Sequence, residues 1–156
     1  MSSYDAGQAV ITRQGEKYLV DMKGPQVANV GVIVKAMHEH GLLSLDEFKK
    51  ALKWGELPLI VLVDSTTKAC GTANSWYGCT RNDQEIEVDT TTLQAFEKGG
   101  DRTDTNAKGQ NVYVLGATIL HELAHWGHKV KGVPETKGHA GDLFEMAVYG
   151  KSLQGA

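Results

Sequence analysis

The sequence has no apolar run that approaches the ~20 residues of a membrane-spanning helix. Its first ten residues, MSSYDAGQAV, lack the charged start and apolar stretch of a classical signal peptide. Basic residues do not dominate either, because 16 Lys and Arg stand against 19 Asp and Glu, and the net charge is −3. These absences argue against a membrane span and against a nucleic-acid partner, which usually needs a basic face. They leave a cytosolic protein, a protein exported by another route, or an excised domain.

Cysteine is also scarce. The two cysteines, Cys70 and Cys79, bound the segment CGTANSWYGC, which is rich in Gly, Ser and Asn. A disulfide-closed turn in an oxidising compartment suits this segment, and two free thiols are the alternative. The spacing is not the CxxC of a zinc knuckle or a redox motif.

The composition fits one domain of 156 residues, 41% hydrophobic and 22% charged. A domain of this size can bury a stable core without disulfides or a structural metal. The pattern predicts a hairpin over 9–22, a buried strand over 58–64 and a half-exposed strand over 85–89, where EIEVD alternates apolar and acidic residues. A polar loop is predicted over 101–111. Helices are expected from Pro25 to about His40, from the capping box Ser44/Glu47 to Gly55, over 90–100, from about Asn111 to Gly127 or His128, and over 142–150 with Gly150 as the stop.

The segment TILHELAHWGHKV carries the strongest chemical signal. His121, Glu122 and His125 spell HExxH within an apolar helical pattern. Four residues advance a helix by about one turn plus 40°, so the two imidazoles project from one face and can grip one Zn²⁺. Glu122 can then serve as the general base without being a ligand. The alternative is a helix whose two histidines are hydrogen-bonded core residues.

A catalytic zinc takes three protein ligands and keeps one position open. His128 can share the helix face only if the helix continues past Gly127, and His139 lies in a loop between glycines. The pattern HExxHxxGxxH does not fit. Glu145 is the preferred third ligand, because a carboxylate among apolar helix neighbours is costly unless it is paired or bound to metal. Asp142 is more simply a first-turn carboxylate.

The segments LHELAHWGH and GDLFEMAVYG, with IEVDTTTLQAFEKG upstream, resemble the zincin-type metallopeptidase toxin domains of bacterial polymorphic toxin and type VI secretion effectors. The resemblance covers about residues 85–150. It implies an α+β, zincin-like fold in which a small mixed sheet packs against the HExxH helix and a C-terminal glutamate helix. By position it implies His121, His125 and Glu145 as gluzincin-like ligands and Glu122 as the base.

The implied reaction is zinc-dependent peptide hydrolysis by a secreted antibacterial effector, with a peptide or protein substrate and a cognate immunity protein as partner. His139 and Tyr149 are candidates for stabilising the oxyanion, and 85–89 is a candidate edge strand for an extended substrate. The absent signal peptide suits delivery by a secretion machine, and a Cys70–Cys79 bridge suits the periplasm of a target cell. The alternatives are a housekeeping peptidase, a peptidoglycan-directed amide hydrolase, and a silent module that zinc merely stabilises.

Overall fold

The computed structural model describes residues 30–52, 56–63, 78–80, 82–90, 94, 103–105, 107, 109, 111–135 and 138–151. The hairpin predicted over 9–22, most of the helix predicted over 90–100, and Cys70 lie outside these residues. In chain order the described elements are α3 (Val30–Gly41), α4 (Leu45–Ala51), β1 (Leu59–Val63), β2 (Gly78–Thr80), β3 (Glu85–Asp89), β4 (Thr103–Thr105), β5 (Asn111–Tyr113), α6 (Val114–Lys131) and α7 (Ala140–Tyr149).

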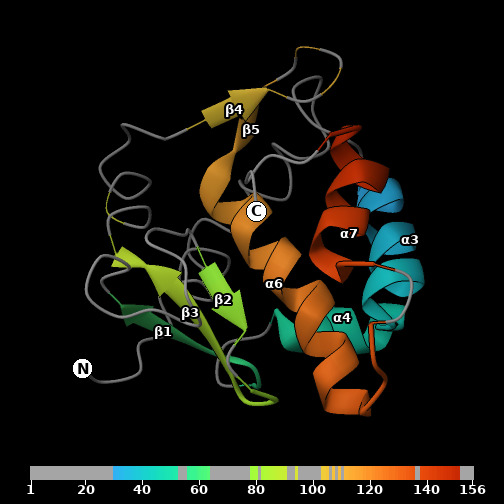
Figure 1. The fold of residues 1–156 in the computed structure, drawn as a ribbon, viewed down its shortest axis with the longest axis vertical. Helices are drawn as coiled ribbons and strands as arrows, with labels where there is room; N and C mark the ends of the chain where they lie inside the picture. Colours follow the sequence, from blue (N-terminus) through green and yellow to red (C-terminus); the bar gives the residue numbers. More distant parts are fainter. Residues whose placement is uncertain are drawn as a thin grey trace.

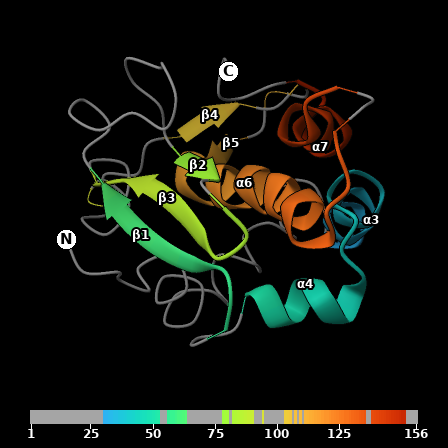
Figure 2. The same ribbon diagram turned by 60° about the horizontal axis from the view of Figure 1, so that its bottom comes forward.

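Helix α6 is the central element of the molecule. It lies between β2 and β3 on one side and α3 and α7 on the other, as both ribbon views show (Figures 1 and 2). Every residue from 116 to 127 is buried. A helix that is apolar all round must be buried by its neighbours. Here the sheet on one side and α3 and α7 on the other enclose the HExxH segment. The α+β class expected from the sequence is confirmed.

The main sheet is mixed and has the order β1-β3-β2. β1 runs parallel to β3, with Leu59 opposite Glu85, and β2 runs antiparallel to β3, with Cys79 opposite Glu87. The expectation that 85–89 is a half-exposed edge strand is therefore wrong. β3 is the central strand, and its acidic residues Glu87 and Asp89 are only 3% and 8% exposed. The alternation of residue types was real, but both faces of the strand are covered.

The polar segment before α6 contains regular structure that the sequence did not predict. β4 and β5 pair antiparallel, with Thr103 opposite Tyr113. A three-residue strand is too short to show periodicity in the sequence, and its formation depends on pairing with a partner strand. As a result α6 begins at Val114 rather than Asn111, and it continues to Lys131, beyond the predicted end.

The predicted helix ends are borne out at two places. The Ser44 hydroxyl accepts the amide of Glu47 at 3.1 Å, and the Glu47 carboxylate accepts the amide of Ser44 at 2.8 Å, which completes the capping box of α4. Gly150 ends α7 in the left-handed region at φ 78°.

Helices α3 and α6 approach each other closely at a glycine. A Cβ atom on Gly127 would lie 1.7 Å from the carbonyl oxygen of Gly41, so no other residue fits there without separating the helices.

Among the described residues, no helix combines the length and apolar character that crossing a bilayer requires.

Candidate metal centre

The HExxH residues lie on the buried stretch of α6. His121, Glu122 and His125 are 3%, 4% and 9% exposed. The Nε2 atoms of His121 and His125 face each other at 3.3 Å. One turn of helix thus brings two imidazole nitrogens to one point, as the spacing predicts, while the carboxylate of Glu122 lies 3.8 Å from His121 Nε2.

His121 is fixed by helix α7. Its Nδ1 atom contacts the Oε2 atom of Glu145, which is completely buried. A Cβ atom on Gly141 would lie 2.3 Å from the His121 Nε2 atom, so the imidazole packs directly on the α7 backbone. Burial opposes the charged imidazolium, but the neighbouring carboxylates of Glu145 and Glu122 outweigh it and raise the pKa of His121.

His125 is fixed by a residue of the following loop. Its Nδ1 atom lies 2.8 Å from Oε2 of Glu135, and the Oε1 atom of the same carboxylate accepts the amide of Ala140 at 2.8 Å. Burial is the main reason that the pKa of His125 is lowered to about 4. Burial opposes ionisation of Glu135 as well, but the hydrogen bonds from Ala140 and His125 together lower its pKa. His125 is therefore neutral at physiological pH, as a metal ligand must be.

His139 lies immediately before α7, and its ring is close to those of the two histidines of α6. Its ring centroid lies 4.1 Å from that of His125 and 5.4 Å from that of His121. Its Nδ1 atom lies 3.3 Å from Oδ2 of Asp142, and its side chain is half exposed. One ligand atom from each of His121, His125 and His139 lies within 4.8 Å of the others.

Glu145 belongs to a different grouping. It lies within the same limit of His121 and Asp142, and that second group does not include His125. Three imidazole nitrogens are a donor set that Zn²⁺ accepts. The residues present thus fit a zinc ion, and the structure brings His139 rather than Glu145 to both histidines of the motif.

Glu122 is held by the edge of the sheet. The hydroxyl of Thr80, on β2, lies 2.8 Å from both Oε1 and the backbone oxygen of Glu122. Burial is the main cause of the raised pKa of Glu122. A carboxylate with a raised pKa suits a group that must take up and release a proton.

Three further residues that the sequence singled out, His128, Tyr149 and Cys79, do not belong to this cluster. His128 directs its ring nitrogens to the carbonyl oxygens of His40, at 2.9 Å, and Val133, at 3.1 Å, so it ties α6 to α3 and to the loop. Tyr149 is buried in the core, where its hydroxyl has no hydrogen-bond partner in the described part of the chain, and burial raises its pKa. Cys79 is disulfide-bonded. Its predicted partner Cys70 lies outside the described residues, so that pairing stays a prediction.

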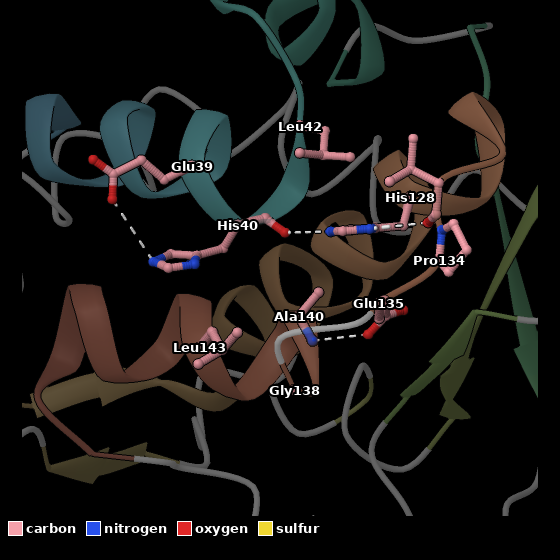
Figure 3. A pocket seen from close by; sticks show the side chains of 10 residues that line it. Glu39, His40, Leu42, His128, Pro134, Glu135, Gly138, Ala140 and Leu143 are labelled. Carbon is pink, nitrogen blue, oxygen red and sulfur yellow. Dashed lines mark hydrogen bonds and ion pairs between the residues drawn. The ribbon is translucent and has the colours of Figure 1, made fainter.

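A cavity of about 510 Å³ opens between α3, the end of α6 and the start of α7. Figure 3 shows His40 and Leu42 at the end of α3, Leu143 on α7, and Glu135 hydrogen-bonded to the backbone of Ala140. Glu135 therefore stands between this cavity and His125.

Sequence reasoning missed Thr80, Glu135 and Gly141. Glu135 follows a proline in a segment read only as a loop, and Thr80 follows the cysteine-bounded turn. No spacing rule links either residue to HExxH, because tertiary packing alone brings them to the motif.

A model of the protein family described as metallopeptidase toxin 3 matches residues 15–150. The chain belongs to this family. Membership confirms the predicted resemblance and extends it upstream from residue 85 to residue 15. It makes the chain a metallopeptidase toxin domain, and it implies a metal ion and a peptide or protein substrate. No curated protein and no solved structure matches the chain significantly.

Proposed function

We propose that this domain hydrolyses peptide bonds with a zinc ion and acts as a secreted antibacterial effector. One observation carries the catalytic part: two imidazole nitrogens face each other at 3.3 Å beside a buried glutamate whose pKa is raised. A helix that used these histidines only for packing would have no need of a third histidine and a general-base carboxylate at the same point.

His121 and His125 would hold the zinc through their Nε2 atoms, with a third ligand from the start of α7. When bound, zinc supplies Lewis-acid polarisation of the substrate carbonyl and lowers the pKa of water. Its affinity for nitrogen ligands and its redox inertness suit a hydrolytic site of this composition.

Glu122 acts as the proton carrier. It removes a proton from the attacking water and then delivers that proton to the leaving amine nitrogen. Thr80 keeps the Glu122 carboxylate in place from the side of β2, at 2.8 Å. This contact couples the sheet edge to the catalytic base.

The same geometry suggests where an extended substrate lies. β2 is the outer strand beside β3 in the described sheet, and its Thr80 reaches the catalytic base. A peptide that adds to this edge by backbone hydrogen bonds would pass directly along Glu122. β2 thus takes the place that the sequence had suggested for residues 85–89.

The effector role draws on the toxin family and on the disulfide at Cys79. Disulfides persist in oxidising compartments such as the periplasm of a target bacterium. A producing cell needs protection from such an enzyme, which a cognate immunity protein would give by covering the site.

The test compares the wild-type protein with Glu122→Gln, which removes the base but keeps the shape. Each is expressed in bacteria with and without a periplasmic export signal. We expect exported wild-type protein to be toxic, Glu122→Gln to be harmless at equal abundance, and mass spectrometry to find new peptide termini only with the wild type. Equal toxicity of the two proteins, or no new termini, would contradict the proposal.

A further inference from the structure

Each of three histidines at this site presents its Nδ1 atom to a different carboxylate. His121 contacts Glu145, and His125 lies 2.8 Å from Glu135. His139 lies 3.3 Å from Asp142. The three carboxylates come from α7 and from the loop before it. Because Nδ1 is occupied by a carboxylate at all three histidines, Nε2 is the ring nitrogen that remains for a metal.

The two nitrogens of an imidazole point away from each other across the ring. In a neutral imidazole only one nitrogen carries a proton, and the hydrogen bond made by that nitrogen fixes which one it is. A carboxylate at Nδ1 keeps the proton on that nitrogen. Nε2 is then unprotonated, and its lone pair can bind a metal. The Nε2 atoms of His121 and His125 do face each other, at 3.3 Å.

Glu145 is badly placed to be a third ligand in this arrangement. Its carboxylate is on the Nδ1 side of His121, whereas the meeting point of the histidines is on the Nε2 side. It shares no candidate metal group with His125. The sequence favoured Glu145 because a carboxylate among apolar neighbours needs a partner, and its contact with His121 supplies one for this completely buried side chain.

His139 has the opposite properties. It occupies the N-cap position of α7, where its side chain makes no capping hydrogen bond. Ser, Thr, Asp and Asn are the residues that cap a helix well, so capping does not account for a histidine there. Its ring lies beside both His125 and His121, and its side chain is half exposed.

Building on the proposed zinc chemistry, we propose that the metal is held by three histidines, His121, His125 and His139, and that Glu145, Glu135 and Asp142 are positioning residues for them. Outer carboxylates of this kind orient a ligating imidazole, and their loss typically lowers metal affinity ~10–100-fold. Glu135 has a double role, since it also accepts the amide of Ala140, the residue next to His139. It thereby links the second ligand to the third.

The first measurement is X-ray absorption at the zinc edge of the wild-type protein loaded with one equivalent of zinc. Imidazole rings give a recognisable multiple-scattering signal. The proposal predicts three imidazoles per zinc. Two imidazoles with a carboxylate would overturn it while leaving the proposed peptidase intact, and absence of bound zinc would contradict both.

The second measurement compares zinc affinities of folded variants by competition with a coloured chelator. We expect His139→Ala to weaken binding by more than ~100-fold, and Glu145→Gln and Glu135→Gln by ~10–100-fold each. His38→Ala, at an exposed histidine of α3, is the matched control and should leave the affinity unchanged. If Glu145→Gln abolishes binding while His139→Ala leaves it intact, the assignment is wrong.

The third measurement needs no metal. Nitrogen-15 NMR of the zinc-free protein distinguishes protonated from bare ring nitrogens. We expect the proton of His125 on Nδ1 in the wild type. In Glu135→Gln the side-chain amide cannot accept from both His125 and Ala140 as the two carboxylate oxygens do, so the Nε2-protonated form should gain population. An unchanged ring in this variant would show that Glu135 does not position His125.

Discussion

Replacing Gly141 with alanine should disable the metal centre from a residue that is neither ligand nor base. The added Cβ atom would lie 2.3–2.5 Å from three atoms of the His121 ring, whereas ordinary van der Waals contact begins at 3.4 Å. The ring must therefore move by about 1 Å, and a displacement of that size at a reacting centre costs ~100-fold in activity. Alanine also favours a helix over glycine by ~1 kcal/mol, against an overlap cost of ~1–3 kcal/mol.

The expected net destabilisation of Gly141→Ala is therefore small, roughly 0–2 kcal/mol, while the loss of function is large. The assay measures zinc affinity, peptidase activity and the free energy of unfolding on the same samples. Gly132→Ala is the matched control, because Gly132 has φ 64° with nothing within 4 Å of its added Cβ atom. It should lose a comparable ~1–2 kcal/mol to backbone strain and keep full zinc affinity. Wild-type zinc affinity in Gly141→Ala would refute the reasoning.

Other outcomes follow from the same contacts. Gly127→Ala places a Cβ atom 1.7 Å from a carbonyl oxygen of α3. It should lower the free energy of unfolding, measured in urea, by at least ~3 kcal/mol. A smaller loss would show that the two helices separate easily. Hydrogen bonds from Lys131 and Ser44 lower the pKa of Glu47 to about 2 from 4.5, so its stabilising contribution is complete above pH 4.5 and is lost as the pH falls towards 2. The stability difference between wild type and Glu47→Gln should shrink over that range, and a constant difference would contradict the assignment. Thr80→Val removes the hydroxyl from Glu122 and should lower kcat roughly 10-fold with little change in KM, as expected for a hydrogen bond to a charged group, whereas Thr80→Ser should restore the rate.

The sequence predicted those parts of the fold that local rules govern. The capping box at Ser44, the apolar run of β1 and the glycine stop at Gly150 each depend on a few neighbouring residues. The HExxH helix was equally visible, because its spacing and its apolar neighbours both follow the helical period.

What failed depended on partners distant in sequence. The position of β3 within the sheet is set by pairing with β1 and β2, so alternation in EIEVD could not show that Glu87 and Asp89 are covered. The three-residue strands β4 and β5 form only because each has the other.

The candidate site shows the same division. Sequence spacing placed His121, Glu122 and His125 together. The preference for Glu145 over His139 as third ligand rested only on the apolar neighbours of Glu145, since both residues lie beyond a loop whose path spacing does not fix. Thr80 and Glu135 reach the motif only through the fold.

The central claim is that the histidine pair of α6 holds a zinc ion used to cut peptide bonds. The most direct test measures zinc content by mass spectrometry and peptide cleavage on the same preparations of wild-type protein, Glu122→Gln, and a variant with both His121 and His125 changed to alanine. We predict one zinc per chain with cleavage in the wild type, one zinc without cleavage in Glu122→Gln, and neither in the double variant. Zinc bound equally by the double variant, or cleavage that persists in Glu122→Gln, would contradict the claim.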